Sequence, residues 1–320
     1  MRRIAVLTSG GDAPGMNAAI RSVVRYAIYC GMSVYGVERG FNGLINDKMT
    51  LMERRSVSDI VQRGGTILKT ARCEEFLTME GQSEAARVLR EHDIEGVVVI
   101  GGDGSFKGAR DLARNCGVAV MGIPGTIDND LNYTDYTIGF DTAVNTVLQS
   151  INNLRDTMSS HDRVSIIEVM GRNCGDIAMY AGLAGGAEII LVPEVEPDYD
   201  AIAKKLNQGK KRGKTSDIIV VAEGVATADE VKSKLEGKTD VSLRTTVLGH
   251  IQRGGMPTMS DRVLAAKLGV QAVNLLKKGE TNRVVGVREG AVIDMNIDEA
   301  LAVEKNFDYK LYNIAGMLGM

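Results

Sequence analysis

Two short motifs place phosphate-binding and proton-accepting groups near one another in the sequence. Residues 95–108 read EGVVVIGGDGSFKG, an apolar run that stops at a glycine turn and continues into a helix-like segment. Such a turn presents backbone N–H groups to an anion, and its glycines let phosphate oxygens approach the backbone. Asp103 adds a carboxylate where a phosphate-bound Mg²⁺ would lie. The motif predicts a phosphate cradle with a metal ligand.

The second motif is PGTIDND at residues 124–130. Phosphoryl transfer needs alignment, charge neutralisation and a base for the attacking hydroxyl. Asp128 suits the base, Asp130 suits an orienting or metal-water role, and Thr126 suits the transferred phosphoryl group. If the segment is extended, both aspartates project to one side of it. The alternative is an Asx-turn cluster in an ordinary loop. The glycine turn upstream favours phosphoryl transfer.

Two further glycine-containing segments differ in whether they can bind a nucleotide. Residues 8–17, TSGGDAPGMN, follow a predicted strand and open a helix, so they would bind another part of a nucleotide or substrate, or form an ordinary strand-to-helix turn. Residues 209–215, GKKRGKT, resemble a P-loop but are one residue too short and precede a strand. They are therefore excluded as a nucleotide motif.

Cationic side chains recur beside the predicted strands. An isolated arginine is usually solvated surface, whereas several that converge would suit phosphorylated substrates. Glu223 ends an apolar run, where a carboxylate would accept a sugar hydroxyl. Arg21 and Arg25 share a helix face, although from the pattern alone a solvated basic surface explains them. The cations expected after strands are Arg72, Arg163, Arg172, Arg244, His250 and Arg253.

The elements that must position these groups alternate between short β-branched runs and amphipathic stretches. This alternation predicts an α/β fold with parallel sheets, in which ligands lie at the carboxyl ends of the strands. Strands are expected at residues 3–8, 33–37, 96–100, 118–123, 164–170, 187–192, 217–222 and 245–251, and near 283–287. Helices are expected near 16–30, 80–92, 105–115, 141–158, 175–185, 199–211, 228–236 and 259–278.

Size and composition limit the function classes. A chain of 320 residues suggests two domains, from a prior of ~150 residues each. A net charge of −3 argues against a nucleic-acid surface. The four cysteines are widely spaced and form no CxxC motif. The first apolar run is too short for a signal peptide, and no run approaches the ~18 residues of a membrane span. We therefore expect a reduced, soluble, cytoplasmic protein.

With these residues assembled, the chain resembles the bacterial ATP-dependent 6-phosphofructokinase family over nearly its whole length. The matching segments are TSGGDAPGMNAAIR, VVVIGGDGS, PGTIDNDL, TDYTIGFDTA, VMGRNCGD, AGGAE and LGHIQRGG. Together they are highly specific, whereas GGDG alone also occurs in NAD kinases and lipid kinases. The resemblance implies Mg²⁺-dependent, in-line transfer of the γ-phosphoryl group of ATP to the 1-hydroxyl of fructose 6-phosphate.

The resemblance also implies an architecture of two doubly wound lobes with mainly parallel sheets and the active site in the cleft between them. Residues 1–139 plus 252–302 would form the larger ATP-binding lobe. Residues 140–251 plus 303–320 would form the smaller lobe that binds fructose 6-phosphate. The implied assembly is a homotetramer regulated allosterically by ADP or phosphoenolpyruvate.

Site residues follow from the same resemblance. Nucleotide binding is assigned to Gly11, Arg72, Cys73, Gly102, Asp103, Gly104, Ser105 and Gly108, with Asp103 near Mg²⁺. Asp128 would be the base, assisted by Thr126, Asp130, Arg172 and Arg72. The sugar phosphate would meet Thr126, Ile127, Asp128, Arg163, Met170, Gly171, Arg172, Glu223, Arg244, His250, Ile251, Gln252 and Arg253, with Arg163 and Arg244 from a neighbouring subunit.

An effector site is assigned by resemblance as well. Its residues are Arg21, Ser22, Val23, Val24, Arg25, Arg155, Gly186, Ala187, Glu188, Arg212, Lys214, Thr215 and Ser216, with Arg54 across an interface. Thr215 and Ser216 replace basic residues of some relatives, which leaves the strength of the response open. Phe41 stands where many relatives have Tyr and Glu74 where many have Pro, both near the nucleotide.

The phosphoryl donor is predicted from sterics. Relatives that use pyrophosphate typically carry Asp at the position of Gly104 and Lys at that of Gly125. An added carboxylate at position 104 would crowd and repel the inner phosphates of ATP. Glycine at both positions therefore favours ATP.

Three other functions fit these motifs less well. A kinase for NAD or a lipid is disfavoured by PGTIDND together with GHIQRGG, which supplies cations for a second phosphate. A dinucleotide-dependent oxidoreductase expects an acidic residue ~20 residues beyond the glycines, where this chain has VMGI at 120–123. A non-catalytic metabolite sensor would not need Asp128 beside Thr126.

Overall fold

The computed structural model describes residues 1–158, 163–304 and 306–319. Contacts within the chain divide it into two compact units. Unit 1 comprises Met1–Thr142 and Arg253–Lys305, and unit 2 comprises Ala143–Gln252 and Asn306–Met320. Each unit has its own sheet and its own apolar core. None of the helices within the described ranges has the length and hydropathy that a membrane span requires.

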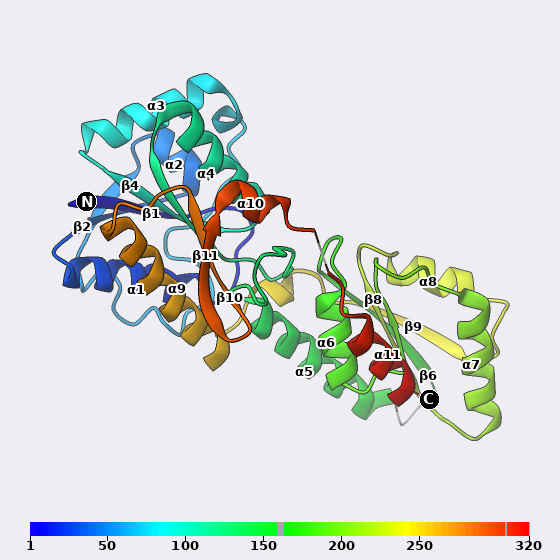
Figure 1. Cartoon of the computed structure of the whole chain (residues 1–320). Helices are drawn as coiled ribbons and strands as arrows, with labels where there is room; N and C mark the ends of the chain where they lie inside the picture. Colours follow the sequence, from blue (N-terminus) through cyan, green and yellow to red (C-terminus); the bar gives the residue numbers. More distant parts are fainter. Residues whose placement is uncertain (159–162, 305, 320) are drawn as a thin grey trace. The chain divides into compact units, whose positions relative to one another are not determined.

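Unit 1 is built on a seven-stranded sheet of order β11-β10-β5-β4-β1-β2-β3. Its inner strands pair in parallel, while β3 and β11 pair antiparallel at the edges. Helices α1 and α9 pack together on one side of the sheet, and α2, α3, α4 and α10 lie on the other (Figure 1). The strands are β1 (Arg3–Thr8), β2 (Ser33–Val37), β3 (Met49–Met52), β4 (Gly96–Gly101), β5 (Ala119–Pro124), β10 (Arg283–Arg288) and β11 (Ala291–Asn296). The helices are α1 (Met16–Tyr29), α2 (Gly40–Ile45), α3 (Met79–Glu91), α4 (Asp103–Cys116), α9 (Met259–Lys277) and α10 (Ile297–Ala302), with a 3₁₀ turn η1 (Glu75–Leu77).

Unit 2 has a smaller, four-stranded sheet of order β7-β8-β6-β9, in which every pairing is parallel. Helices α7 and α8 cover one face, and α6 and α11 lie against the other (Figure 1). The strands are β6 (Arg163–Val169), β7 (Ile189–Leu191), β8 (Asp217–Ala222) and β9 (Ser242–Val247). The helices are α6 (Asp176–Ala184), α7 (Tyr199–Lys211), α8 (Ala228–Leu235) and α11 (Tyr309–Leu318), with a 3₁₀ turn η2 (Gly249–Arg253). Helix α5 (Phe140–Met158) begins in unit 1 and continues into unit 2.

The predicted α/β fold with mainly parallel sheets is confirmed. Fully buried strands such as β4 and β8 read as continuous Val/Ile runs, which is the pattern of a sheet covered on both faces. Helix starts follow local capping chemistry: the Thr227 hydroxyl accepts from Glu230 N–H, and the Glu230 carboxylate accepts from Thr227 N–H. The Asp198 carboxylate likewise caps α7.

Some predicted elements were wrong or incomplete. The strand expected at 245–251 starts and ends earlier, because Gly249 adopts φ +53° and the chain enters η2. The edge strands β3 and β11 were not predicted, since both are only partly buried and lack a continuous apolar run. The short helices α2 and α10 and the terminal helix α11 were also not predicted. Helices of six residues carry too few turns to show a periodicity.

Candidate functional site

The glycine turn after β4 leads directly into helix α4. Gly102 is the extended N-cap residue of α4, with φ −95° and ψ −164° and no side-chain cap. The N–H groups of Ser105 and Phe106 donate to the Gly102 carbonyl at 3.0 and 3.1 Å. Within the described residues, the N–H groups of Asp103 and Gly104 precede the first helical hydrogen bond and have no helical acceptor. These two groups, together with the helix dipole, are suited to a phosphate.

The Ser105 side chain packs against Gly101 of this turn. It is buried, and its Oγ has no hydrogen-bond partner among the described residues. A Cβ at Gly101 would lie 2.4 Å from that Oγ and 2.6 Å from the Ser9 carbonyl oxygen. By contrast, a Cβ at Gly104 would meet no described atom within 4 Å. Position 101 therefore must be glycine for packing, whereas position 104 leaves space open in front of the helix.

Backbone hydrogen bonds join the turn to the loops on either side. Ser9 N–H donates to the Ile100 carbonyl at 3.0 Å, and Gly125 N–H donates to the Gly101 carbonyl at 2.9 Å. The loops after β1, β4 and β5 thus lie side by side at the carboxyl edge of the sheet. A Cβ at Gly102 would lie 3.5 Å from Thr126 Cβ and 3.8 Å from its Oγ1. The Thr126 side chain therefore faces the glycine turn.

Asp128 is held in the loop after β5. Its side chain is 1% exposed, and its backbone N–H donates to Thr126 Oγ1 at 3.2 Å. Asn129 adopts a left-handed conformation with φ +52°, and its Oδ1 accepts from Thr137 N–H at 3.0 Å. The predicted extended segment, with Asp128 and Asp130 on one side, is therefore wrong. The left-handed residue bends the chain between the two aspartates.

Arg253 lies against the loop after β1. Its Nη1 donates to the Asp12 carbonyl at 3.3 Å. A Cβ at Gly11 would lie only 2.3 Å from the same Nη1, so a side chain at position 11 would displace the guanidinium. Burial raises the pKa of the Asp12 carboxyl, and backbone hydrogen bonds and the Arg253 charge only partly offset this effect. Gly11 and Arg253, predicted for different ligands, therefore lie together within unit 1.

The segment that carries Arg72 and Cys73 is tied to helix α1 by Asn17. The Asn17 side chain is fully buried; it donates to the Arg63 and Gly65 carbonyls at 2.9 and 2.7 Å. It also accepts from Ile67 N–H at 2.8 Å. Arg72 is exposed and Cys73 half-buried at the end of this segment. Asn17 was not assigned a role from the sequence, because its partners are backbone groups almost fifty residues away.

An aromatic pair borders α4. The rings of Phe41 and Phe76 stack with centroids 4.0 Å apart and planes 16° from parallel. A Cβ at Gly108 would lie 3.0 Å from Phe41 and 3.3 Å from Phe76. Both rings are buried in the apolar core, so glycine at 108 lets α4 pack closely against them. No role was predicted for Phe76 from the sequence. Aromatic residues make up only 4% of the chain, and this scarcity is the signal that could have drawn attention to it.

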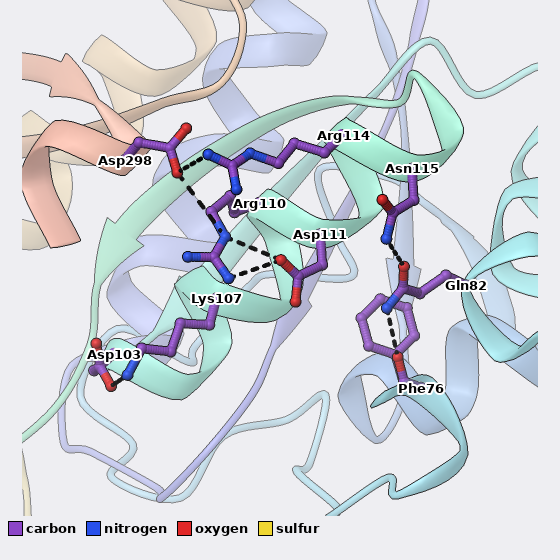
Figure 2. A network of polar contacts seen from close by, with 9 residues as sticks. All are labelled: Phe76, Gln82, Asp103, Lys107, Arg110, Asp111, Arg114, Asn115 and Asp298. Atoms are coloured by element: carbon purple, nitrogen blue, oxygen red, sulfur yellow. Dashed lines mark hydrogen bonds and ion pairs between the residues drawn. The ribbon is translucent and has the colours of Figure 1, made fainter. Parts of the chain in front are cut away.

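Helix α4 is held in place by a polar network (Figure 2). Arg114 Nη2 lies 2.8 Å from Asp298 Oδ1 of α10. The Gln82 side chain donates to the Phe76 carbonyl at 3.1 Å and accepts from the Asn115 side chain at 2.6 Å. At the start of the helix, Lys107 Nζ lies 2.7 Å from Asp103 Oδ2. These contacts link α4 to both η1 and α10.

In unit 2, the loops after β6, β8 and β9 are joined by side chains. Met170 N–H donates to Gln252 Oε1 at 3.1 Å, and Gln252 is fully buried. Arg172 N–H donates to Glu223 Oε1 at 2.9 Å, and Arg172 adopts φ +52°. The structure therefore brings together Met170, Gly171, Arg172, Glu223 and Gln252. His250 and Ile251 are exposed on η2 beside Gln252.

Arg163 and Arg244 lie elsewhere in the same sheet. Arg163 is the first residue of β6, opposite Ser242, and Arg244 lies within β9, opposite Ser165. The expectation that both follow strands is therefore wrong, because Arg163 starts β6 and Arg244 lies inside β9. Strand β6 has seven residues, so at about 3.3 Å per residue its two ends lie roughly 20 Å apart. Neither arginine joins the cluster around Met170.

The effector residues predicted in unit 1 lie along α1. Arg21 and Arg25 line a cavity of about 270 Å³ between α1 and α9. The Ser22 hydroxyl donates to the Ala266 carbonyl at 2.8 Å. Val23 and Val24 are fully buried, so their side chains belong to the core. Arg54 is exposed in the loop after β3.

The effector residues predicted in unit 2 form an ionic cluster. Lys214 Nζ lies 3.0 Å from Glu188 Oε1 and 2.7 Å from Asp217 Oδ1. Burial acts to lower the pKa of Lys214, but hydrogen bonds to the two carboxylates raise it overall. Arg155 Nη2 donates to the carbonyls of Gly185 and Gly186 at 2.8 Å each. Of the remaining predicted residues, Ala187 is buried, Ser216 half-buried, and Arg212 and Thr215 exposed.

Comparison with known proteins supports one family. The family model described as phosphofructokinase matches residues 3–276. The ATP-dependent 6-phosphofructokinase of Clostridium botulinum is 59% identical over 318 residues, which cover 99% of both chains.

Solved structures show the same fold. The phosphofructokinase of Saccharomyces cerevisiae superposes with a TM-score of 0.89 at 34% identity, covering 100% of this chain and 48% of the yeast chain. A pyrophosphate-dependent phosphofructokinase from Marinobacter aquaeolei superposes with a TM-score of 0.84 at 23% identity, covering 97% of this chain and 86% of that one. At that identity the second likeness concerns the fold alone.

The two glycines of the turn give a matched pair of substitutions. Gly101→Ala is expected to lower the free energy of unfolding by about 1–3 kcal/mol, because its Cβ overlaps the Ser9 carbonyl. Gly104→Ala should leave stability unchanged or slightly higher, since helices favour Ala. It should weaken binding of a polyphosphate, whose space it enters. Thermal unfolding and equilibrium binding measure both effects; equal destabilisation by the two variants would contradict this account.

Proposed function

Because the chain belongs to the phosphofructokinase family, we propose that it catalyses the ATP-dependent phosphorylation of fructose 6-phosphate to fructose 1,6-bisphosphate. One observation carries the mechanism: Thr126 faces the Gly102 turn, and Asp128 is bonded to Thr126 in the next loop. A phosphate cradle and a carboxylate are thus parts of one backbone arrangement. The proposed step belongs to glycolysis and places the protein in the cytoplasm.

Unit 1 supplies the nucleotide site in this proposal. The N–H groups of Asp103 and Gly104 bind phosphate oxygens, and Gly11 and Gly102 allow the backbone to approach them. Arg72 adds positive charge, while Gly108 and Cys73 lie beside the base. The half-exposed Asp103 carboxylate and the orphaned Ser105 hydroxyl fit a metal–polyphosphate ligand. Mg²⁺, when bound, supplies charge neutralisation for the phosphates.

The chemical step is assigned to the loop after β5. Asp128 accepts the proton of the sugar 1-hydroxyl as that oxygen attacks the γ-phosphorus, so the alkoxide does not have to form beforehand. The bond from the γ-phosphorus to the β,γ-bridging oxygen breaks in the same step, and ADP leaves. Thr126 holds the transferred group against the glycine turn, and Asp130 orients the loop. Arg172 and Arg72 stabilise the negative charge of the transferring phosphoryl group. Burial of Asp128 keeps bulk water away from the proton transfer.

In unit 2, the loops after β6, β8 and β9 are proposed to contact the sugar phosphate. They present Met170, Gly171, Arg172 and Glu223 to the sugar, with His250, Ile251 and Gln252 beside them. Arg163 and Arg244 are proposed to serve a neighbouring subunit of a homotetramer. Their position apart from the Met170 cluster supports that role, since within one chain they lie beyond its reach.

The donor is proposed to be ATP. The open space at Gly104 admits the inner phosphates of a nucleotide, and a Cβ at Gly125 would lie 3.0 Å from Ile100 and 3.2 Å from Met16. A long side chain at 125 is therefore excluded without repacking. A coupled assay with ATP, pyrophosphate or no donor, with and without fructose 6-phosphate, tests this directly. Turnover is expected with ATP and the hexose phosphate together; turnover with pyrophosphate would reverse the donor assignment.

Asp128→Asn tests the base. Because the amide cannot accept the hydroxyl proton, kcat should fall by about 10²- to 10⁴-fold. Binding of both substrates should change little, since an amide of the same shape replaces the carboxylate. Asp240→Asn, an exposed aspartate of unit 2, is the matched control and should retain full kcat. A kcat near that of the unaltered protein would remove Asp128 from this role.

The effector proposal rests on the basic groups of each unit. Arg21 and Arg25 line the α1–α9 cavity, and Arg155, Gly186, Glu188 and Lys214 cluster in unit 2. The assigned set is completed by the side chains of Arg54, Arg212, Thr215 and Ser216. It also includes the backbone of Ser22, Val23, Val24 and Ala187. The phosphate groups of ADP or phosphoenolpyruvate would pair with the basic side chains of this set.

The double variant Arg21→Ala/Arg25→Ala should abolish the response of activity to ADP and phosphoenolpyruvate, because two cations of the anion site are lost. Activity is measured over a range of effector concentrations at subsaturating fructose 6-phosphate. Arg87→Ala/Arg90→Ala, on the exposed face of α3, is the control pair. A response that persists in the first double variant would show that the effector site has been wrongly assigned.

A further inference from the structure

Lys107 is a cation at the phosphate end of α4 to which none of the sites above assigns a role. Its Nζ lies 2.7 Å from Asp103 Oδ2, one helical turn earlier (Figure 2). Helical side chains lean toward the N-terminus of their helix. The ammonium therefore lies beside the first turn, where the N–H groups of Asp103 and Gly104 face an incoming anion.

The other cations of α4 have different partners. Arg110 contacts Asp111 and lies 3.9 Å from Asp298, and Arg114 lies 2.8 Å from Asp298 (Figure 2). These contacts attach the later part of the helix to α10. Among the three cations of α4, Lys107 is the one whose pairing directs it toward the helix start.

We propose that Lys107 is a further donor-binding residue, which pairs with Asp103 in the unliganded protein and with the terminal phosphates of the donor when the metal occupies Asp103. This inference rests on the proposed nucleotide site. The Lys107–Asp103 pair is half-exposed, with side-chain exposures of 54% and 37%. Exposed ion pairs one turn apart on a helix stabilise it only slightly, so their exchange for another partner costs little.

The charges and the space both favour that exchange. Metal binding at Asp103 occupies the carboxylate that neutralises Lys107, while a polyphosphate brings several negative charges to the helix start. Ammonium–phosphate contacts are among the stronger hydrogen bonds. Apart from the two chain neighbours and the backbone of α4 itself, no described atom lies within 4 Å of a Cβ at Gly104, the residue next to Asp103. The ammonium therefore has room to move to a ligand, and the contact should matter more as the number of phosphates increases.

Lys107→Met tests the proposal with a side chain of similar length but no charge. The dissociation constants of a non-hydrolysable ATP analogue with Mg²⁺ and of AMP are measured by calorimetry. The constant for the triphosphate analogue should rise by about 10- to 150-fold, as for loss of a charged hydrogen bond, and that for AMP by less than about 2-fold. Lys107→Arg should retain most of the affinity. Arg114→Met removes an equally exposed pair from the same helix and should change neither constant.

Two outcomes would overturn the inference. Unchanged affinity of Lys107→Met for the analogue would show that Lys107 is a solvent-exposed side chain that does not contact the donor. Equal weakening of analogue and AMP would point to a distorted helix start. Asp103→Asn separates this test from the proposed function: if that variant retains Mg²⁺-dependent binding, the metal assignment itself is wrong. If Asp103→Asn weakens binding and Lys107→Met does not, only the role of Lys107 is lost.

Discussion

The hydrogen bond from Gly125 N–H to the Gly101 carbonyl joins the two loops on which the proposed chemistry depends. It continues the parallel ladder of β4 and β5 by one step beyond the last paired residues, Gly101 and Pro124. Because parallel strands end at the same edge of a sheet, the glycine turn proposed to bind phosphate and the loop that carries Asp128 begin from one fixed point. The separation of cradle and carboxylate is therefore set by backbone geometry.

The same constraint explains where glycine is required. At Gly101 the backbone of the neighbouring loop leaves no room for a Cβ, whereas at Gly104 the space is open and faces the helix start. The first glycine is required for packing, and the second is free of that constraint and is proposed to leave space for the ligand. Sequence alone presents them as members of one motif, and only their neighbours separate the two roles.

Each unit repeats one architectural principle, in which loops at the carboxyl edge of a parallel sheet are tied together by hydrogen bonds. In unit 1 the ties are mainly backbone bonds with Asn17 and Arg253 added, and in unit 2 they are the side chains of Gln252 and Glu223. Buried polar side chains of this kind stabilise one loop conformation, since breaking the bond leaves an unpaired group in the interior. Glu188 and Lys214 play a comparable role around the strand β8.

The sequence by itself determined the α/β class, the inner strands, the glycine turn that opens α4 and the family resemblance. These features depend on local composition: Val/Ile runs, glycine at a strand end, and caps such as Thr227. Tertiary structure decided what local patterns cannot encode. It placed Arg253 against Gly11, stacked Phe76 on Phe41, bent the chain at Asn129, and put Arg163 at the start of β6 and Arg244 inside β9. Each of these outcomes depends on contacts between distant segments or on a single backbone angle, which side-chain periodicity does not specify.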